Sequence, residues 1–281
     1  MTPAAPATAA SAATVRDETA TASFDTEAAM RRPLSTLPVD MPVAPIRIDC
    51  GPVMFGQRRA LETISLTLSE ARIAIVGRNG SGKTTLMRLI AGLIAPSSGS
   101  VRLGDIDPHH DRRGALRAIG IVFQNPDRQI LFPTVEEELA FGLVQQGLHQ
   151  REAVTRAREA LGAAGRAHWA PMPVSALSGG QRQALCLMAV LLMKPANILL
   201  DEPFASLDLP GRARLARHLA TLPQRVITIG HDPAPLEGAG RVLWLERGRL
   251  VADGPAGTVL PRYLAAMERL GRDDADADLA G

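Results

Sequence analysis

The sequence predicts an α/β fold in which helices cover both faces of a mostly parallel sheet. Three short runs are mostly apolar, as strands buried on both faces are: residues 72–77, 118–123 and 225–230. A fourth apolar run, at residues 197–200, ends in two carboxylates. Helical patterns separate these runs along the chain, and this order of elements is typical of parallel α/β proteins.

The segments at the two ends of the chain differ from this plan. Residues 1–44 are rich in Ala, Thr, Pro and Ser without periodicity, so we expect a disordered N-terminal extension. Alternating apolar and polar side chains within residues 45–70 predict an antiparallel β subdomain. One domain is expected over residues 45–271, followed by an acidic, solvated tail at residues 272–281 that contains four aspartates.

A helical stretch interrupts the alternation of strands and helices at about residues 134–195. It includes QALCLMAVLLM at residues 183–193, whose almost continuous apolar character predicts a buried helix. Thr134 and Glu137 have the spacing of a capping box, so a helix is expected to begin directly after Thr134. We therefore expect a separate helical lobe within the domain.

Composition argues against several functions. The net charge of +2 comes without a dense basic cluster with interleaved aromatics, so no nucleic-acid partner is expected. Cys50 and Cys186 lie far apart, which predicts buried reduced thiols rather than a metal site. The longest apolar run, at residues 184–193, is much shorter than the roughly 20 residues that cross a bilayer. The N-terminus lacks the basic start and apolar centre of a signal peptide, so a cytoplasmic protein is expected.

A glycine-rich segment, GRNGSGKT at residues 77–84, follows the first buried strand and opens a helix. It fits the pattern G-x-x-x-x-G-K-[ST], in which backbone N–H groups surround phosphate oxygens. Lys83 would contact the β- and γ-phosphates, Thr84 would offer a hydroxyl to Mg²⁺, and the helix dipole adds positive charge. The pattern predicts a P-loop NTPase fold of the RecA-like kind, with ATP bound by Gly77, Arg78, Asn79, Gly80, Ser81, Gly82, Lys83, Thr84 and Thr85.

Polar residues follow two other buried strands. Asp201 is expected to hold Mg²⁺ through water, as the acidic residue of a P-loop enzyme does, and Glu202 is expected to polarise the attacking water. His231 follows residues 225–230, and a lone histidine is more often structural than catalytic. Its place at the end of a core strand nevertheless predicts a hydrogen bond to the γ-phosphate and the water.

The segment LSGGQRQ at residues 177–183 supports two interpretations that are compatible. Ser178 and Gln181 form a capping-box pattern for the helix that follows. A capping box does not require Gly179 and Gly180, however. Two glycines let a ligand approach the helix N-terminus, where the dipole attracts anions.

With these motifs in this order, the chain resembles the ATP-binding subunits of ABC transporters across its folded domain. The segments that match the family motifs are residues 77–84 (Walker A), Gln124 (Q-loop), residues 177–183 (signature), residues 198–202 (Walker B), Ser206-Leu207-Asp208 (D-loop) and His231 (switch histidine).

This resemblance implies a head-to-tail dimer in which each ATP lies between two chains. Ser178, Gly179, Gly180 and Gln181 of one chain, with Asp208, would cover the ATP on the phosphate loop of the other. Gln124 would sense Mg²⁺ and the γ-phosphate and would join Glu202 and His231 in catalysis. The implied partners are integral membrane transport subunits and a second ATPase subunit, identical or paralogous, at the cytoplasmic face of the membrane.

Two further segments, around Phe55 and Gln124, bear on this resemblance. The family usually stacks the adenine base on an aromatic residue, and Phe55 is the suitable candidate, although ordinary packing also explains it.

The sequence Gln124-Asn125-Pro126-Asp127, followed by Gln129, is similar to the Q-loop of energy-coupling factor (ECF) importers. Asn125-Pro126-Asp127 would then form a hinge between the core and the helical lobe.

The transported substrate is less clearly indicated. Residues 191–232 look most like the ATPases of biotin uptake systems, and cobalt or nickel uptake is the alternative. A soluble ABC protein without a transport role, or a domain that binds ATP without cleaving it, is disfavoured. The chain has one phosphate loop and a short helical lobe, and both Glu202 and His231 are present.

Overall fold

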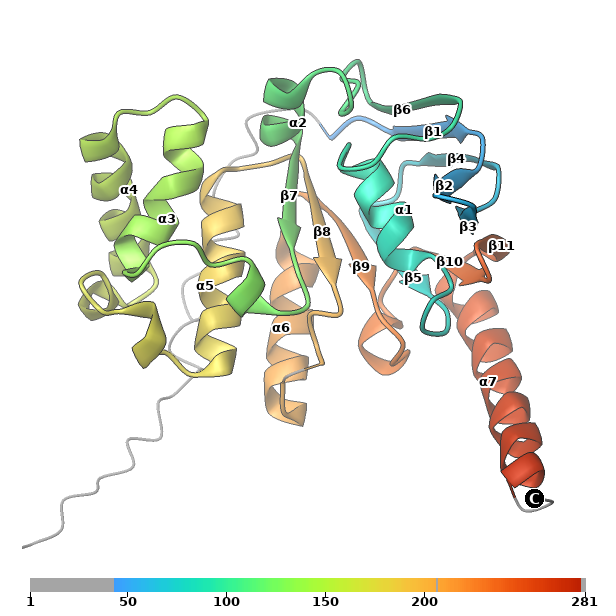
Figure 1. Cartoon of the computed structure of the whole chain (residues 1–281). Helices are drawn as coiled ribbons and strands as arrows, with labels where there is room; N and C mark the ends of the chain where they lie inside the picture. Colours follow the sequence, from blue (N-terminus) through green and yellow to red (C-terminus); the bar gives the residue numbers. More distant parts are fainter. Residues whose placement is uncertain (1–42, 206, 279–281) are drawn as a thin grey trace, which may run out of the picture.

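The computed structural model describes residues 43–205 and 207–278, and their side chains up to residue 272 (Figure 1). Apart from its last two positions, the N-terminal extension expected at residues 1–44 lies outside the described residues. Ser206 of the expected D-loop and the last three residues of the expected tail also lie outside them.

A six-stranded sheet forms the centre of the molecule, in the order β11-β10-β5-β9-β8-β7. All neighbouring pairs are parallel except β10 and β11. The predicted α/β fold with a mostly parallel sheet is therefore confirmed. The strands are β5 (Arg72–Val76), β7 (Ile119–Val122), β8 (Asn197–Asp201), β9 (Arg225–Ile229), β10 (Arg241–Glu246) and β11 (Arg249–Gly254).

Side chains of the central strands alternate between two hydrophobic clusters, one on each face of the sheet. On β5, Ile73 and Ile75 face the cluster with helix α1 (Lys83–Ile90), whereas Ala74 and Val76 face the other. That second cluster includes side chains from α5 (Gly179–Leu192), α6 (Leu209–Thr221) and α7 (Ala256–Asp278). Both faces are buried, which explains why the strands are mostly apolar in sequence.

The antiparallel subdomain is confirmed and packs over α1 (Figure 1). Its three-stranded sheet has the order β4-β1-β6, and a separate two-stranded ribbon pairs β2 with β3. The strands are β1 (Ile46–Cys50), β2 (Val53–Phe55), β3 (Arg58–Leu61), β4 (Ile64–Leu68) and β6 (Gly99–Leu103). Helix α2 (Arg112–Ala118) then leads into β7.

A helical lobe lies beside the sheet and has its own hydrophobic cluster around Trp169 (Figure 1). Its helices are α3 (Val135–Gln145) and α4 (Gln150–Ala163), with 3-10 turns at Ala167–Trp169 and Val174–Ala176. The expected capping box of Thr134 and Glu137 is present. Helix α5 contributes side chains to both the lobe cluster and the sheet cluster, so it joins the two parts.

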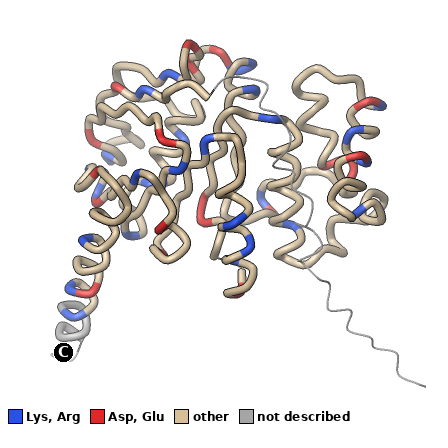
Figure 2. The backbone as a smooth tube through the Cα atoms, turned by 180° about the vertical axis from the view of Figure 1, so that it is seen from behind, with Lys and Arg blue, Asp and Glu red and all other residues tan. Residues whose placement is uncertain are grey.

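The C-terminal helix α7 runs along the sheet and then projects away from the core (Figure 1). Its Pro261 lies near the start of the helix, and its backbone stays helical through Asp278. The tail expected from residue 272 onward therefore begins inside a helix. In the part of the chain that is described, no helix combines the length and apolar character that a membrane crossing requires. Acidic and basic residues are interspersed over the chain (Figure 2).

Candidate nucleotide-binding and hydrolysis site

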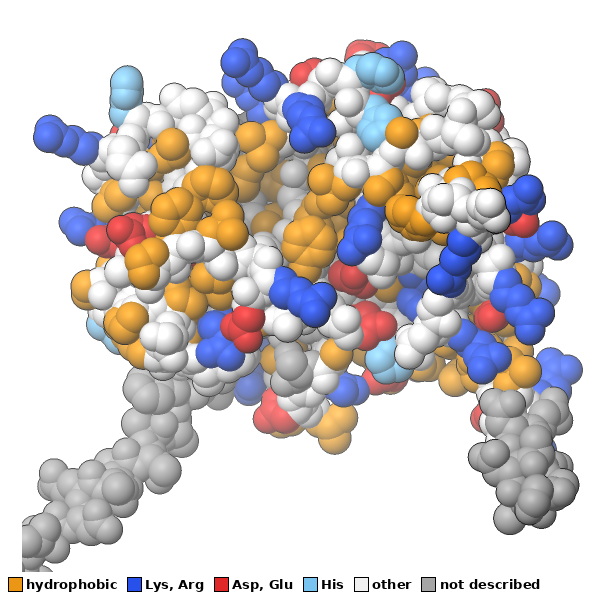
Figure 3. Space-filling model, viewed as in Figure 1, with side chains coloured by type: hydrophobic (Ala, Val, Ile, Leu, Met, Phe, Trp, Pro, Cys, Tyr) orange, Lys and Arg blue, Asp and Glu red, His pale blue; other side chains and the backbone are white. Residues whose placement is uncertain are grey.

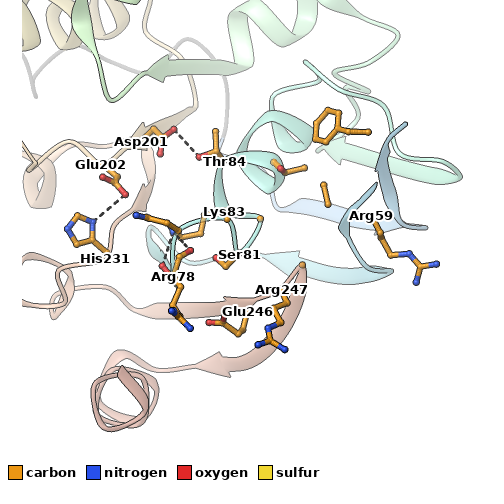
Figure 4. Close-up of a pocket in the computed structure, with 18 of the residues that line it drawn as sticks. Arg59, Arg78, Ser81, Lys83, Thr84, Asp201, Glu202, His231, Glu246 and Arg247 are labelled. Atoms are coloured by element: carbon orange, nitrogen blue, oxygen red, sulfur yellow. Dashed lines mark hydrogen bonds and ion pairs between the residues drawn. The ribbon is translucent and has the colours of Figure 1, made fainter. Parts of the chain in front are cut away.

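A cavity of about 1110 Å³ lies at the carboxyl ends of the parallel strands, where the phosphate loop joins β5 to α1 (Figure 4). This is the edge of a parallel sheet where ligands of α/β proteins bind. Sequence motifs from three strands meet there. The expected residues that line the cavity are Phe55, Gly77, Arg78, Asn79, Gly80, Ser81, Gly82, Lys83, Thr84, Thr85, Gln124, Asp201, Glu202 and His231.

The glycines of the phosphate loop are required by its backbone. Gly77, Gly80 and Gly82 have φ values of 149°, 76° and 105°, which other residues rarely adopt. A Cβ on Gly77 would lie 2.1 Å from the carbonyl oxygen of Leu245, so the loop touches the end of β10. Gly82 also precedes α1, and it has no side chain that could cap the helix. The first backbone N–H groups of α1 therefore remain available to a ligand.

Lys83 lies at the base of the cavity and is 6% exposed. Its ammonium donates to the carbonyl oxygens of Gly77, at 2.8 Å, and Arg78, at 2.9 Å. Burial lowers the pKa of Lys83, and the nearby carboxylates, Glu202 first, act in the opposite direction. A buried cation beside a glycine-rich loop is suited to bind phosphate oxygens.

Thr84 and Asp201 place two oxygen ligands close together. The Thr84 hydroxyl donates to Oδ2 of Asp201 at 3.3 Å, and Asp201 is 8% exposed (Figure 4). Burial raises the pKa of Asp201, and the charge of Glu202 adds to that effect. Mg²⁺ binds through one or two protein oxygens together with substrate phosphates and waters. The residues present therefore fit this metal ion, whose charge would stabilise the ionised carboxylates.

Glu202 lies at the centre of three interactions. Its Oε2 accepts a hydrogen bond from the Gln124 amide at 2.9 Å. Its Oε1 lies 3.3 Å from Nδ1 of His231 (Figure 4). Glu202 has a φ of 48°, and its N–H donates to the carbonyl of Ile229 on β9. Left-handed backbone in a non-glycine residue is a form of strain that is common at functional sites.

The segment between β7 and α3 is fixed at both ends. On the core side, Gln129 accepts from the Phe123 N–H at 3.0 Å and donates to the Ile121 carbonyl at 3.2 Å. On the lobe side, the buried carboxylate of Glu138 accepts from the N–H groups of Leu131 and Phe132. The segment is therefore attached by hydrogen bonds both to the core and to the helical lobe.

This segment also contacts the helix of the signature. The carboxylate of Asp127 lies 2.8 Å from Nε of Arg182, and Arg182 donates through Nη1 to the carbonyl of Leu177. The segment that follows Gln124 is thus linked to the signature helix by the contact between Asp127 and Arg182.

The signature residues lie elsewhere on the chain. Ser178 accepts from the N–H of Gln181, and the side chain of Gln181 accepts from the N–H of Ser178, so the expected capping box is present. Ser178 and Gly179 are exposed, and none of the four residues Ser178–Gln181 lines the phosphate-loop cavity. Asp208 is also outside that cavity, where it caps α6 through the N–H of Gly211.

Several residues that line the cavity were not expected from the sequence. Arg58 and Arg59 belong to β3 and lie near Phe55, which is 48% exposed at the same cavity. Ala60 of β3 also lines the cavity, and the rest come from β10, the turn after it, and α7: Glu246, Arg247, Gly248 and Tyr263. No local pattern marks these last four residues, because the pairing of β10 with β5 brings this part of the chain to the site.

Comparisons with known proteins agree with this geometry. The model of the family described as ABC transporter matches residues 61–205, so the residues contributed by β10 and α7 lie outside the matched span. The biotin transport ATP-binding protein BioM of Rhodobacter capsulatus is 52% identical over 75% of this chain and 91% of its own length. The energy-coupling factor transporter ATP-binding protein EcfA of Enterococcus faecium is 37% identical over 70% of this chain and 73% of its own.

Among solved structures, a dimer of the ATP-binding cassette MJ0796 in a post-hydrolysis state, bound to ADP and Pi, is similar to this chain. Its TM-score is 0.65 at 25% identity, over 75% of this chain and 98% of that one. This chain belongs to the ATP-binding subunits of ABC transporters, and within them to the energy-coupling factor type. It binds nucleotide and is an ATPase.

Proposed function

We propose that this chain hydrolyses ATP to energise biotin uptake, as a peripheral subunit at the cytoplasmic face of a membrane transporter. The ATPase chemistry is supported most directly by the contacts of Glu202 with Gln124 and His231 beside the phosphate loop. The choice of biotin is supported by the 52% identity to the biotin transport protein of Rhodobacter capsulatus.

The phosphate loop and the two oxygen ligands beside it bind the triphosphate. Backbone N–H groups at the start of α1 and the ammonium of Lys83 face the β- and γ-phosphates. Thr84 and Asp201 would hold Mg²⁺, the latter through water, and Gln124, which follows β7, would complete the set. Mg²⁺ supplies positive charge to the phosphate oxygens when it is bound.

Glu202 acts on the attacking water. Its carboxylate accepts a hydrogen bond from the water and orients the water oxygen toward the γ-phosphorus. Gln124 and His231 hold this carboxylate from two sides, and His231 also contacts the γ-phosphate. Because the three residues follow three different strands, small shifts of the sheet edge or of the β7–α3 segment change their alignment.

The signature residues serve a second ATPase subunit. Ser178, Gly179 and Gly180 lie at an exposed helix N-terminus outside the chain's own cavity, where they can cover ATP bound to another chain. Gln181 and Asp208 support this surface through their caps. This chain contains both halves of a composite site, so two identical copies form two complete sites, and we infer a homodimer.

The membrane subunits dock beside the β7–α3 segment. Leu131 is 68% exposed there, next to the ring pair of Phe132 and Phe141. Hydrophobic side chains gather over the helical lobe and at the hollow between the lobe and the core (Figure 3). Through contact with this surface, a transmembrane subunit and a substrate-capture subunit would sense the position of the helical lobe, which depends on Gln124.

The proposal is tested by expressing the chain with candidate membrane subunits, purifying the complex and measuring uptake of labelled biotin and labelled Co²⁺ into vesicles. We expect ATP-dependent biotin uptake, abolished by Glu202→Gln. Uptake of the metal ion alone would contradict the biotin assignment, and a chain that hydrolyses ATP but co-purifies with no membrane subunit would contradict the transport role.

A further inference from the structure

The nucleotide cavity is lined by positive charge that lies outside the phosphate loop. Three exposed arginines contribute it: Arg58 and Arg59 on β3, and Arg247 in the turn between β10 and β11. None of them fills the hydrophobic core, because all three side chains are open to solvent. They also take no part in the phosphate, metal and water contacts described above.

The three arginines differ in their partners. Nη1 of Arg59 lies 2.8 Å from Oε2 of Glu62, so the charge of Arg59 is compensated. Within the part of the chain that is described, Arg58 and Arg247 form no ion pair and no side-chain hydrogen bond, not even with Glu246, which lines the same cavity. We refer to Arg58 and Arg247 as the cationic rim, since both line the cavity with an uncompensated charge.

The backbone of Arg247 has a conformation that arginine rarely adopts. Arg247 and Gly248 form the two-residue turn of the β10–β11 hairpin, in which Glu246 pairs with Arg249. Their φ values are 48° and 78°, as in a type I′ turn, whose first central position favours asparagine, aspartate or glycine. The turn alone would be served better by one of those residues. The arginine at this position therefore indicates a role for its side chain outside folding.

Backbone contacts fix this turn against the phosphate loop. The Gly248 N–H donates to the Ser81 carbonyl at 2.9 Å, and the Gly248 carbonyl accepts from the N–H of Glu62 at 2.8 Å. A Cβ on Gly248 would lie 2.8 Å from the carbonyl oxygen of Ala60, so the turn also touches β3. Arg247 is thus held one residue away from a backbone contact of the phosphate loop, at the tip of the hairpin (Figure 4).

The β2–β3 ribbon places Arg58 beside the aromatic residue of the cavity. Arg58 is the direct cross-strand partner of Phe55, and side chains of directly opposite residues project to the same face of a ribbon. Both side chains line the cavity. The cationic rim therefore has one member next to Phe55 and the other next to the phosphate loop.

The chemistry of the rim fits a phosphate group. A guanidinium offers planar pairs of N–H donors that match phosphate oxygens. Lys83 and the N-terminus of α1 face the β- and γ-phosphates, which leaves the α-phosphate, the one closest to the base, for other donors. An arginine pair between the aromatic residue and the phosphate loop is suited to that group.

We propose that Arg58 and Arg247 are further nucleotide-binding residues, which contact the α-phosphate from β3 and from the β10–β11 turn. ADP and ATP share this phosphate, so the rim contributes equally to the binding of both. The inference rests on the proposed function only in that the cavity binds an adenine nucleotide with its phosphates at the loop.

The test compares the full wild-type chain with Arg58→Gln and Arg247→Asn. Each change removes one positive charge, and asparagine suits the backbone of the turn. Arg47→Gln is the matched control, since Arg47 is an exposed arginine of β1, in the same subdomain, and does not line the cavity. The probes are ADP and a non-hydrolysable ATP analogue, each with Mg²⁺. Calorimetry gives the dissociation constants at low and high salt, and the melting temperature is measured without nucleotide.

We expect each rim variant to bind both nucleotides about fivefold more weakly, the change that an interaction of about 1 kcal/mol gives. The ratio of the two affinities should stay at its wild-type value. The loss should be larger at low salt, because salt screens exposed charges. Arg247→Asn should melt at or above the wild-type temperature, since asparagine fits the turn. Arg47→Gln should bind as wild type does.

Wild-type affinity in either rim variant would overturn the inference. A loss confined to the ATP analogue would also overturn it, because the contact would then be to the γ-phosphate. Weaker binding with a lower melting temperature, or an equal loss in Arg47→Gln, would point to destabilisation or net charge instead. Binding is measured without turnover, so a wild-type chain that binds both nucleotides but does not hydrolyse ATP would contradict the proposed function alone.

Discussion

Helices α1 and α5 both begin beside glycines, and they differ in what satisfies their first backbone N–H groups. Helix α1 begins after Gly82, which has no side chain to cap it, and its N-terminus faces a cavity. Helix α5 begins after Ser178, whose capping box with Gln181 satisfies its N-terminus locally, at the surface. The first site is therefore built for a ligand within the chain, and the second is stable alone and is presented to another molecule.

The largest effect is expected at the phosphate-loop site, from Glu202→Gln. The amide cannot act as a base toward water, so turnover should fall about 10²-fold to 10⁴-fold. Nucleotide binding should persist, because the phosphate loop is intact. Phosphate release and nucleotide binding measured on the same preparation check both statements, and undiminished hydrolysis would sink the assignment of Glu202.

Lys83→Ala should show, through its effect on ATP affinity, that the N-terminus of α1 binds nucleotide within the single chain whereas that of α5 does not. Removing the buried ammonium should weaken ATP binding to the single chain about 10-fold to 100-fold, as expected for a charged hydrogen-bond donor. Arg102→Ala, at an exposed position of β6, is the control and should bind normally. If Lys83→Ala binds ATP as tightly as wild type, the phosphate loop is not the primary site.

Ser178→Ala should show the reverse behaviour. Loss of the cap should cost about 1 kcal/mol of folding free energy, measurable as a lower denaturation midpoint. Binding of ATP to the single chain should not change, because Ser178 lies outside that cavity. Turnover at high protein concentration should fall about tenfold. A loss of single-chain binding would contradict the separation of the two regions.

Glu138→Gln tests the joint between the core and the lobe and should have the smallest effect on chemistry. The buried carboxylate accepts two backbone N–H groups, so the variant should lose about 1–3 kcal/mol of stability. Nucleotide binding should remain. Glu136→Gln, at an exposed ion pair with Arg158, is the comparison and should change stability little. Equal melting temperatures for the two variants would argue against the anchoring role of Glu138.

The sequence was sufficient to predict the parts of the site that are coded locally. Residues 77–84 specify a turn in which three glycines have positive φ. The buried strands that end at Asp201 and just before His231 indicate that both residues lie at the same edge of the sheet. Tyr263 and Glu246 could not be found this way, because their position depends on the order of strands in the sheet. Strand β10 pairs with β5 although most of the domain lies between these two strands in sequence.

The C-terminal helix shows the same limit. Its apolar positions, including Val259, Leu260 and Tyr263, follow helical spacing, but Pro261 and the nearby acidic residues obscure the helix in sequence. Pro261 lies inside α7, where a proline is unfavourable because it cannot donate the hydrogen bond of a helix interior. What α7 packs against, and hence its place at the wall of the nucleotide cavity, depends on tertiary structure alone.

The central claim is that the phosphate loop of one chain works with the signature of another, and mixed dimers test it most directly. Lys83→Ala and Gly180→Trp chains, each nearly inactive alone, are mixed in equal amounts, and ATP hydrolysis is measured. Random pairing makes half of the dimers mixed, each with one intact composite site, so activity should recover to about a quarter of wild type. A mixture no more active than its two parents would contradict the claim.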